Sequence, residues 1–191
     1  LHERFSERIR TYDEILKGAA GLHAASEHIN RAEWRTYVGA LRLDEDHFGM
    51  QGLGFAPLLK GALLEQHVAM ARAEGFPAYE VTPPGDRPEK APIFYIEPFH
   101  GRNLLAFGFD MFSESVRREA MQRARDSGGI AYSGRVRLVQ ETEFDVQAGL
   151  LAYMPVYKGG LHPPTLEQRR RLLDGWVYAT FRMADLFNAV F

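Results

Sequence analysis

Few residues of this chain have the types and spacing that enzymatic chemistry requires. Gly49, Gly52 and Gly54 form the pattern G-x-x-G-x-G, which matches neither the G-x-x-x-x-G-K-[ST] phosphate loop nor the dinucleotide fingerprint, and so predicts a tight turn. The seven histidines form no i, i+4 pair, and the G-x-S-x-G and H-E-x-x-H motifs are absent. Cysteine is also absent, which excludes a thiolate nucleophile, a disulfide and a cysteine-ligated metal site. We expect a non-catalytic chain without cofactor or metal.

Asp110 is a candidate for ligand binding because of what precedes it. Residues 104–109 carry no polar side chain, and we expect them to form a buried strand that ends at this carboxylate. A buried carboxylate costs free energy unless it is hydrogen-bonded. It can either cap the next helix or face a cavity and accept charge-assisted hydrogen bonds from a ligand, each contributing about 1.5–3 kcal/mol. Neighbouring aromatic residues fit a pocket wall and equally an ordinary core: Tyr95, Phe107, Phe109, Tyr132 and Tyr153.

Composition sets the broad class of the protein. The chain has 191 residues, of which 46% are hydrophobic and 25% charged, a balance typical of one globular domain. Its net charge of -2 argues against nucleic acid as a main partner. It contains no run of about 18 apolar residues, so no segment of it is expected to cross a membrane. Because it opens on Leu1 and ends on an apolar run, we interpret it as an excerpt of a longer protein.

The apolar pattern predicts a long first helix over residues 3–24. Apolar side chains recur there at spacings of three and four, from Phe5 through Tyr12 to Ala19. Such a narrow stripe can pack against the rest of the domain or against a second copy of the chain. Asn30 is expected to cap a second helix.

The rest of the chain predicts a mixture of strands and helices. Helices are expected over 58–74, from Ser113 to Arg125, and from the capping box of Thr165 and Gln168 to the chain end. Strands are expected over residues 79–82, 93–97, 130–133, 136–142 and 149–156. Without regular strand–helix alternation, we predict an α+β fold: an antiparallel sheet with flanking helices between a long N-terminal helix and a closing C-terminal helix.

Several segments, taken in order, resemble one protein family. The sequence is similar over residues 5–190 to the CHASE domain, the extracytoplasmic sensor module of histidine kinases, nucleotide cyclases and diguanylate cyclases. The segments that carry the resemblance are 49–57, 74–76, 108–111, 117–120 with 124–128, 133 with 137–141, and 154–157. No single segment decides it, but their order is specific.

The resemblance implies a domain organisation and a location. It implies a stalk helix over residues 1–28, a PAS-like ligand-binding domain over 29–164 and a closing helix over 165–191. It further implies a periplasmic or extracellular domain of a membrane protein, with membrane-spanning helices in flanking segments and a cytoplasmic kinase or cyclase as output.

The resemblance also implies a ligand site. In the plant members the ligand is cytokinin, and the matched aspartate is Asp110. Residues matched to the pocket lining are Tyr132, Thr142 and Met154, beside the aromatic candidates Tyr95 and Phe109. Residues 112–115 depart from the plant pattern, so the ligand is an unidentified small molecule. The expected partner is a second copy, bound through the N-terminal helix. The alternative function is a ligand-free ectodomain for dimerisation or protein–protein interaction.

Overall fold

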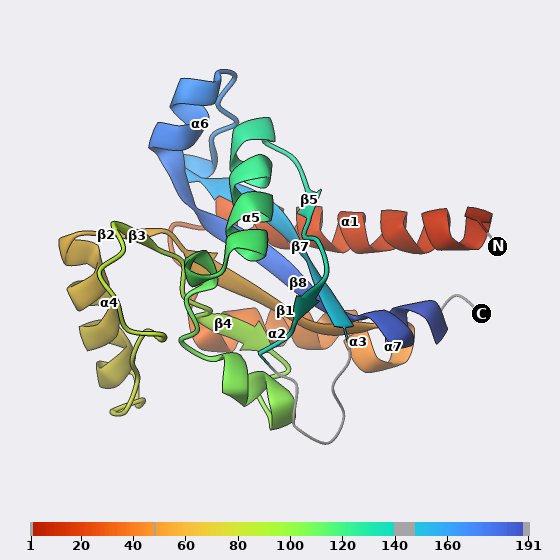
Figure 1. Cartoon of the computed structure of the whole chain (residues 1–191), viewed down its shortest axis with the longest axis horizontal. Helices are drawn as coiled ribbons and strands as arrows, with labels where there is room; N and C mark the ends of the chain where they lie inside the picture. The colour runs from red at the N-terminus through yellow and green to blue at the C-terminus, as the bar shows by residue number, and fades with distance from the viewer. Residues whose placement is uncertain (1, 48, 140–147, 189–191) are drawn as a thin grey trace.

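A long helix opens the structure, as the apolar stripe predicts. The computed structural model describes residues 2–47, 49–139 and 148–188. Helix α1 (His2–Ala25) lies along one face of a sheet (Figure 1). Its apolar side chains Tyr12, Leu16 and Ala19 are fully buried against that sheet. The predicted cap of the second helix is also confirmed, because Asn30 and Glu33 form a reciprocal capping box at its start.

The elements after α1 combine short helices with strands of very different length. Strands β1, β7 and β8 are the long ones, and α4 and α5 are the longer helices in this part of the chain. In chain order the elements are α2 (Arg31–Leu41), α3 (Leu43–Asp46), β1 (Met50–Pro57), β2 (Leu59–Lys60), α4 (Ala62–Ala73), β3 (Glu89–Lys90), β4 (Tyr95–Glu97), η1 (Gly101–Ala106), η2 (Met111–Ser113), α5 (Ser115–Ser127), β5 (Ala131–Tyr132), β6 (Val136–Arg137), β7 (Ala148–Tyr157), η3 (Lys158–Gly160), α6 (Leu166–Leu172), β8 (Leu173–Arg182) and α7 (Met183–Asn188).

The sheet is antiparallel and six-stranded. Its order is β4-β1-β8-β7-β5, and β6 pairs with β7 as well. Strand β8 is the centre, paired with β1 on one side and with β7 on the other. Strands β2 and β3 form a separate two-stranded sheet beside α4. The predicted α+β class is therefore confirmed: a long N-terminal helix, an antiparallel sheet with flanking helices and a C-terminal helix, α7.

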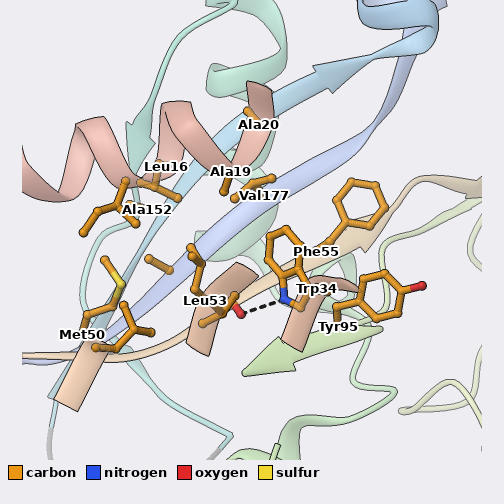
Figure 2. Packing of buried hydrophobic residues seen from close by; sticks show 14 of the residues in the cluster. Leu16, Ala19, Ala20, Trp34, Met50, Leu53, Phe55, Tyr95, Ala152 and Val177 are labelled. Carbon is orange, nitrogen blue, oxygen red and sulfur yellow. Dashed lines mark hydrogen bonds between the residues drawn. The ribbon is translucent and has the colours of Figure 1, made fainter. Parts of the chain in front are cut away.

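The two faces of the sheet carry two hydrophobic clusters. The first lies under α1 and α2, where Trp34 packs beside Phe55 and donates from Nε1 to the Leu53 carbonyl oxygen at 3.3 Å (Figure 2). The second lies under α5 and is built around Tyr153, Trp176 and Tyr178. Helices α1 and α5 thus cover opposite faces of the sheet.

The prediction of a continuous closing helix over residues 165–191 is wrong. The helix that begins at Thr165 ends at Leu172, and residues 173–182 form the central strand β8 before the short α7. Successive side chains of β8 point to opposite clusters: Trp176 lies in the second and Val177 in the first. A strand buried on both faces is apolar at nearly every position, so its sequence also fits a buried helix.

The predicted strand before Asp110 is wrong as well. Residues 101–106 form the 3-10 helix η1, with three residues per turn. Asn103 and Ala106 are buried, whereas Leu104 and Leu105 are about half exposed, at 48% and 57%. The amide of Asn103 explains this orientation, since it donates to the Gln51 and Pro98 carbonyl oxygens at 3.2 and 2.8 Å.

Three further boundaries differ from the predictions. Residues 79–82 form no strand, and only Thr82 makes an isolated bridge, with Phe109. Helix α5 is capped by Glu114 rather than Ser113, because the Glu114 carboxylate accepts from the N–H groups of Val116 and Arg117. The strand expected over 136–142 is seen at Val136–Arg137, and its last residues lie outside the described ranges.

The glycine segment does more than turn the chain. Gly49 has a φ of 97° and turns into β1, whereas Gly52 and Gly54 lie within that strand. A Cβ atom at Gly54 would lie 2.0 Å from the Tyr95 carbonyl oxygen and 2.4 Å from the Tyr178 hydroxyl. Glycine is required at this position because the Tyr178 hydroxyl crosses it to donate to the Tyr95 carbonyl oxygen at 2.9 Å.

Candidate ligand site beside Asp110

Asp110 is fully buried and hydrogen-bonded within the protein. Its Oδ1 accepts from the N–H groups of Ala91 at 2.8 Å and Phe112 at 3.0 Å, so it caps η2. Its Oδ2 accepts from Nε of Arg87 at 2.8 Å. Of the two arrangements that the sequence left open, the structure contains the helix cap, and the charge of the carboxylate is matched by a guanidinium.

Arg87 connects Asp110 to the surface. Its Nε donates to the Asp110 carboxylate, and its Nη2 donates to the Pro83 carbonyl oxygen at 2.6 Å. The Arg87 side chain keeps 24% of its surface exposed, while that of Asp110 keeps none. The buried acid therefore fixes one arginine in a loop between residues 82 and 89 that is otherwise largely exposed.

A cavity of about 430 Å³ opens beside this pair. We call it the Arg87 cavity. It lies where the β2–β3 sheet, the start of α4 and the loop around Arg87 meet, and a volume of this size is sufficient for a small-molecule ligand. Its wall is formed by Leu59, Gly61, Leu64, Gly85, Asp86, Arg87, Pro88 and Lys90.

Large side chains of the described residues pack between the sheet and α5. Tyr153, Trp176, Tyr178 and Met121 are completely buried there. The Tyr153 hydroxyl lies 3.4 Å from Sδ of Met111, immediately after Asp110. Burial raises the pKa of the Tyr153 hydroxyl, so this phenol stays neutral. Of the ion pair, only Arg87 reaches the wall of a cavity.

The structure separates the other predicted site residues between the two faces of the sheet. Phe109 lies on the side of α5, where the Arg117 guanidinium is 5.3 Å from its ring centroid. Tyr95, Tyr132 and Met154 pack against the cluster under α1. Thr142 lies outside the described residues. The predicted residues therefore do not form one pocket around Asp110.

The three residues on the α1 side have specific contacts of their own. The Tyr95 hydroxyl donates to the Ile29 carbonyl oxygen at 2.8 Å, and burial raises the pKa of Tyr95 to about 12. Tyr132 donates to Oδ1 of Asp13 at 2.7 Å. Met154 lies on the wall of a second cavity, of about 250 Å³, between α1 and β7.

Sequence reasoning missed Arg87 and Lys90. Both lie in or next to a proline-rich turn that has no recognisable motif. The distance in sequence from Arg87 to Asp110 is 23 residues, and only the folded chain brings their charges together. The one signal in the sequence is that a buried Asp110 needs a cation as partner, and this does not distinguish among the arginines of the chain.

Comparison with protein families gives a match over most of the chain. The CHASE domain profile matches residues 27–191. The chain belongs to the CHASE domain family. CHASE domains are extracytoplasmic sensory, non-catalytic domains of signalling proteins, which bears out the resemblance seen in the sequence. A comparison with curated proteins finds no match.

This CHASE domain shows neither a membrane-spanning helix nor a metal-binding cluster in the part that the structure describes. Within residues 2–47, 49–139 and 148–188, no helix combines the length and apolar character needed to cross a bilayer. Over the same ranges, no three histidine or acidic side chains are grouped closely enough to hold a metal ion.

Proposed function

We propose that this CHASE domain binds a small molecule in the Arg87 cavity and transmits the signal to a cytoplasmic kinase or cyclase of the same protein. The ion pair between Asp110 and Arg87 carries the proposal, because a buried carboxylate holds a cation at the wall of a cavity large enough for a ligand. In this proposal Arg87 contacts the ligand, and Asp110 positions Arg87 from behind.

A continuous path of backbone hydrogen bonds supports transmission from the cavity to the sheet. The Asp110 N–H donates to the Thr82 carbonyl oxygen at 2.6 Å, next to the loop that carries Arg87. The Ile93 N–H donates to the Phe109 carbonyl oxygen at 2.9 Å, and the Phe94 N–H donates to that of Phe55 in β1 at 3.2 Å. Strand β1 pairs in turn with the central strand β8.

The same path leads to both terminal helices. Strand β8 continues directly into α7, and α1 packs on β7 and β8. At Gly49 the two helices come together, since a Cβ atom there would lie 3.2 Å from the Tyr12 hydroxyl and 3.0 Å from Cα of Leu186. A ligand that drives a two-state switch from 1:99 to 99:1 needs about 5.5 kcal/mol of differential binding between the two states.

Ligand binding can be tested with a panel of small metabolites. We expect at least one compound to raise the melting temperature and to bind in isothermal titration calorimetry. Arg87→Gln should weaken that binding about tenfold or more, because it removes the charge-assisted contact. Arg135→Gln, at an exposed position, is the matched control. A compound that binds both variants equally well would remove Arg87 from the site.

The alternative is a ligand-free ectodomain that dimerises through α1. It rests on Phe5 and Ile9, which remain partly exposed although they continue the buried stripe of Tyr12 and Leu16. Sedimentation analysis of the wild type and of Phe5→Glu tests it. A dimer that Phe5→Glu dissociates, together with an empty ligand screen, would favour this function.

A further inference from the structure

The wall of the Arg87 cavity contains a lysine whose ammonium group is unpaired within the part of the chain that the structure describes. Lys90, on β3, is 9% exposed, yet among the described residues no hydrogen bond or ion pair engages its ammonium group. Nζ of Lys90 is not itself fully buried, so the alkyl chain accounts for most of the buried surface and the ammonium stays accessible to an anion. Since Lys90 lines the cavity, the space into which an anion would fit is already present.

Two more groups of positive character border the same space. Gly61 gives helix α4 no side-chain cap, and of the first N–H groups that of Leu64 donates to the Gly61 carbonyl oxygen at 3.2 Å. Both Gly61 and Leu64 line the cavity, so the positive end of this helix borders it. Arg87 uses Nε and Nη2 within the protein, and no hydrogen bond from the described residues engages Nη1.

We propose that the ligand of the Arg87 cavity carries a phosphate group, held by the ammonium of Lys90, the N–H groups at the start of α4 and Nη1 of Arg87. This inference rests on the proposed function and adds the chemical class of the ligand. A tetrahedral phosphate offers several acceptor oxygens in different directions, which matches donors from three elements better than a planar carboxylate does.

One acidic group faces the same cavity. Asp86 lies on its wall, is exposed and makes no ion pair with Lys90 in the described structure. The negative charge of Asp86 repels an anion and so lowers the affinity of the cavity for phosphate. It does not neutralise Lys90, with which it makes no ion pair. Neighbouring Glu89 is occupied by Lys60, whose Nζ lies 2.7 Å from Oε1.

The test uses inorganic phosphate as the probe, with the wild-type chain and three variants. Lys90→Met removes the unpaired ammonium. Lys60→Met is its matched control, because Lys60 lies on the paired strand β2 but its side chain is 53% exposed. Asp86→Asn removes the opposing charge. Affinity is measured by calorimetry at constant ionic strength, and amide hydrogen exchange at residues 62–64 supplies a second readout that does not depend on melting.

We expect Lys90→Met to weaken phosphate binding about tenfold or more, Lys60→Met to leave it within about twofold, and Asp86→Asn to strengthen it about threefold. Exchange at residues 62–64 should slow when phosphate binds the wild type. The inference would be overturned if phosphate bound the wild type and Lys90→Met with equal affinity and slowed their amide exchange equally. It would also be overturned if acetate bound as tightly as phosphate. A neutral metabolite that depends on Arg87 but not on Lys90 would overturn it while leaving the proposed function intact.

Discussion

The hydroxyl of Tyr132 donates a hydrogen bond to Oδ1 of Asp13 at 2.7 Å, and it joins the edge strand β5 to the middle of α1. The two residues are 119 positions apart in the sequence. Burial and the Asp13 carboxylate both raise the pKa of Tyr132, so the phenol keeps its proton and remains the donor. This contact fastens the long helix to the sheet on the face opposite α5.

Removing the Tyr132 hydroxyl should loosen that attachment. We expect Tyr132→Phe to lower the free energy of unfolding by about 2 kcal/mol, because the bond is charge-assisted and partly buried. Urea unfolding measures the change. In a double-mutant cycle with Asp13→Asn the two losses should not add, and additive losses would show that the residues act independently.

Replacing Asp110 by asparagine should destabilise the loop around Arg87. The variant leaves the Arg87 guanidinium without its carboxylate. We expect the free energy of unfolding to fall by about 3 kcal/mol, the lower end of what removing one partner of a buried ion pair costs. Urea unfolding gives the total, and hydrogen exchange should be faster in residues 82–91 before other regions respond. If Asp110→Asn unfolds at the same urea concentration as the wild type, the ion pair contributes nothing to stability.

Acid should destabilise the protein through buried histidine. Burial first, and Arg31 second, lower the pKa of His67 from 6.5 to about 4. The unfolded chain therefore binds more protons between these values, and stability falls as the pH is lowered from about 6.5 to about 4, by up to roughly 3 kcal/mol for this residue.

The histidine contribution can be separated by substitution. His23 is partly buried, and this burial lowers its pKa to about 4, so the wild type should lose stability through both residues. His67→Asn should flatten the dependence of unfolding free energy on pH in this window. An unchanged slope in urea titrations at pH 7, 6, 5 and 4 would contradict the assignment.

A methyl group at Gly54 should be poorly tolerated. Gly54→Ala places Cβ on the Tyr95 carbonyl and the Tyr178 hydroxyl in the middle of the sheet, with an expected cost of about 3 kcal/mol or failure to fold. Gly21→Ala is the control, since nothing lies within 4 Å of its Cβ position in α1. It should stabilise the chain by up to about 1 kcal/mol, as alanine does in helices. Equal thermal stability of the two variants would contradict this account.

Replacing Arg31 by lysine should destabilise the protein. Its guanidinium lies 4.8–5.3 Å from the centroids of five aromatic rings, and Nη1 donates to the Phe94 carbonyl oxygen at 3.0 Å. The rings are Phe76, Phe94, Tyr95, Phe99 and Phe107. A compact ammonium loses planar stacking, so Arg31→Lys should cost about 2 kcal/mol in thermal or urea unfolding. Arg35→Lys, in the same helix, should change stability by less than about 0.5 kcal/mol.

The sequence by itself determined the features that depend on neighbouring residues. The stripe from Tyr12 to Ala19 predicted α1, and Asn30 as a cap predicted the start of α2, where the structure adds the reciprocal bond of Glu33. Both are recognisable because helical hydrogen bonds and caps join residues three or four positions apart. The order of short segments was also sufficient to indicate the CHASE family, which the match over residues 27–191 confirms.

Only the tertiary structure decided what depends on pairing between distant segments. Residues 173–182 became a strand because β1 and β7 lie on either side and both faces are covered, an environment that their own periodicity does not reveal. Likewise, Asp110 was visible as a buried acid, but its pairing with Arg87 and the cavity beside Lys90 arise where separate loops meet. Local spacing specifies helices and caps, whereas a binding site assembled from several segments is specified by the packing of the whole chain.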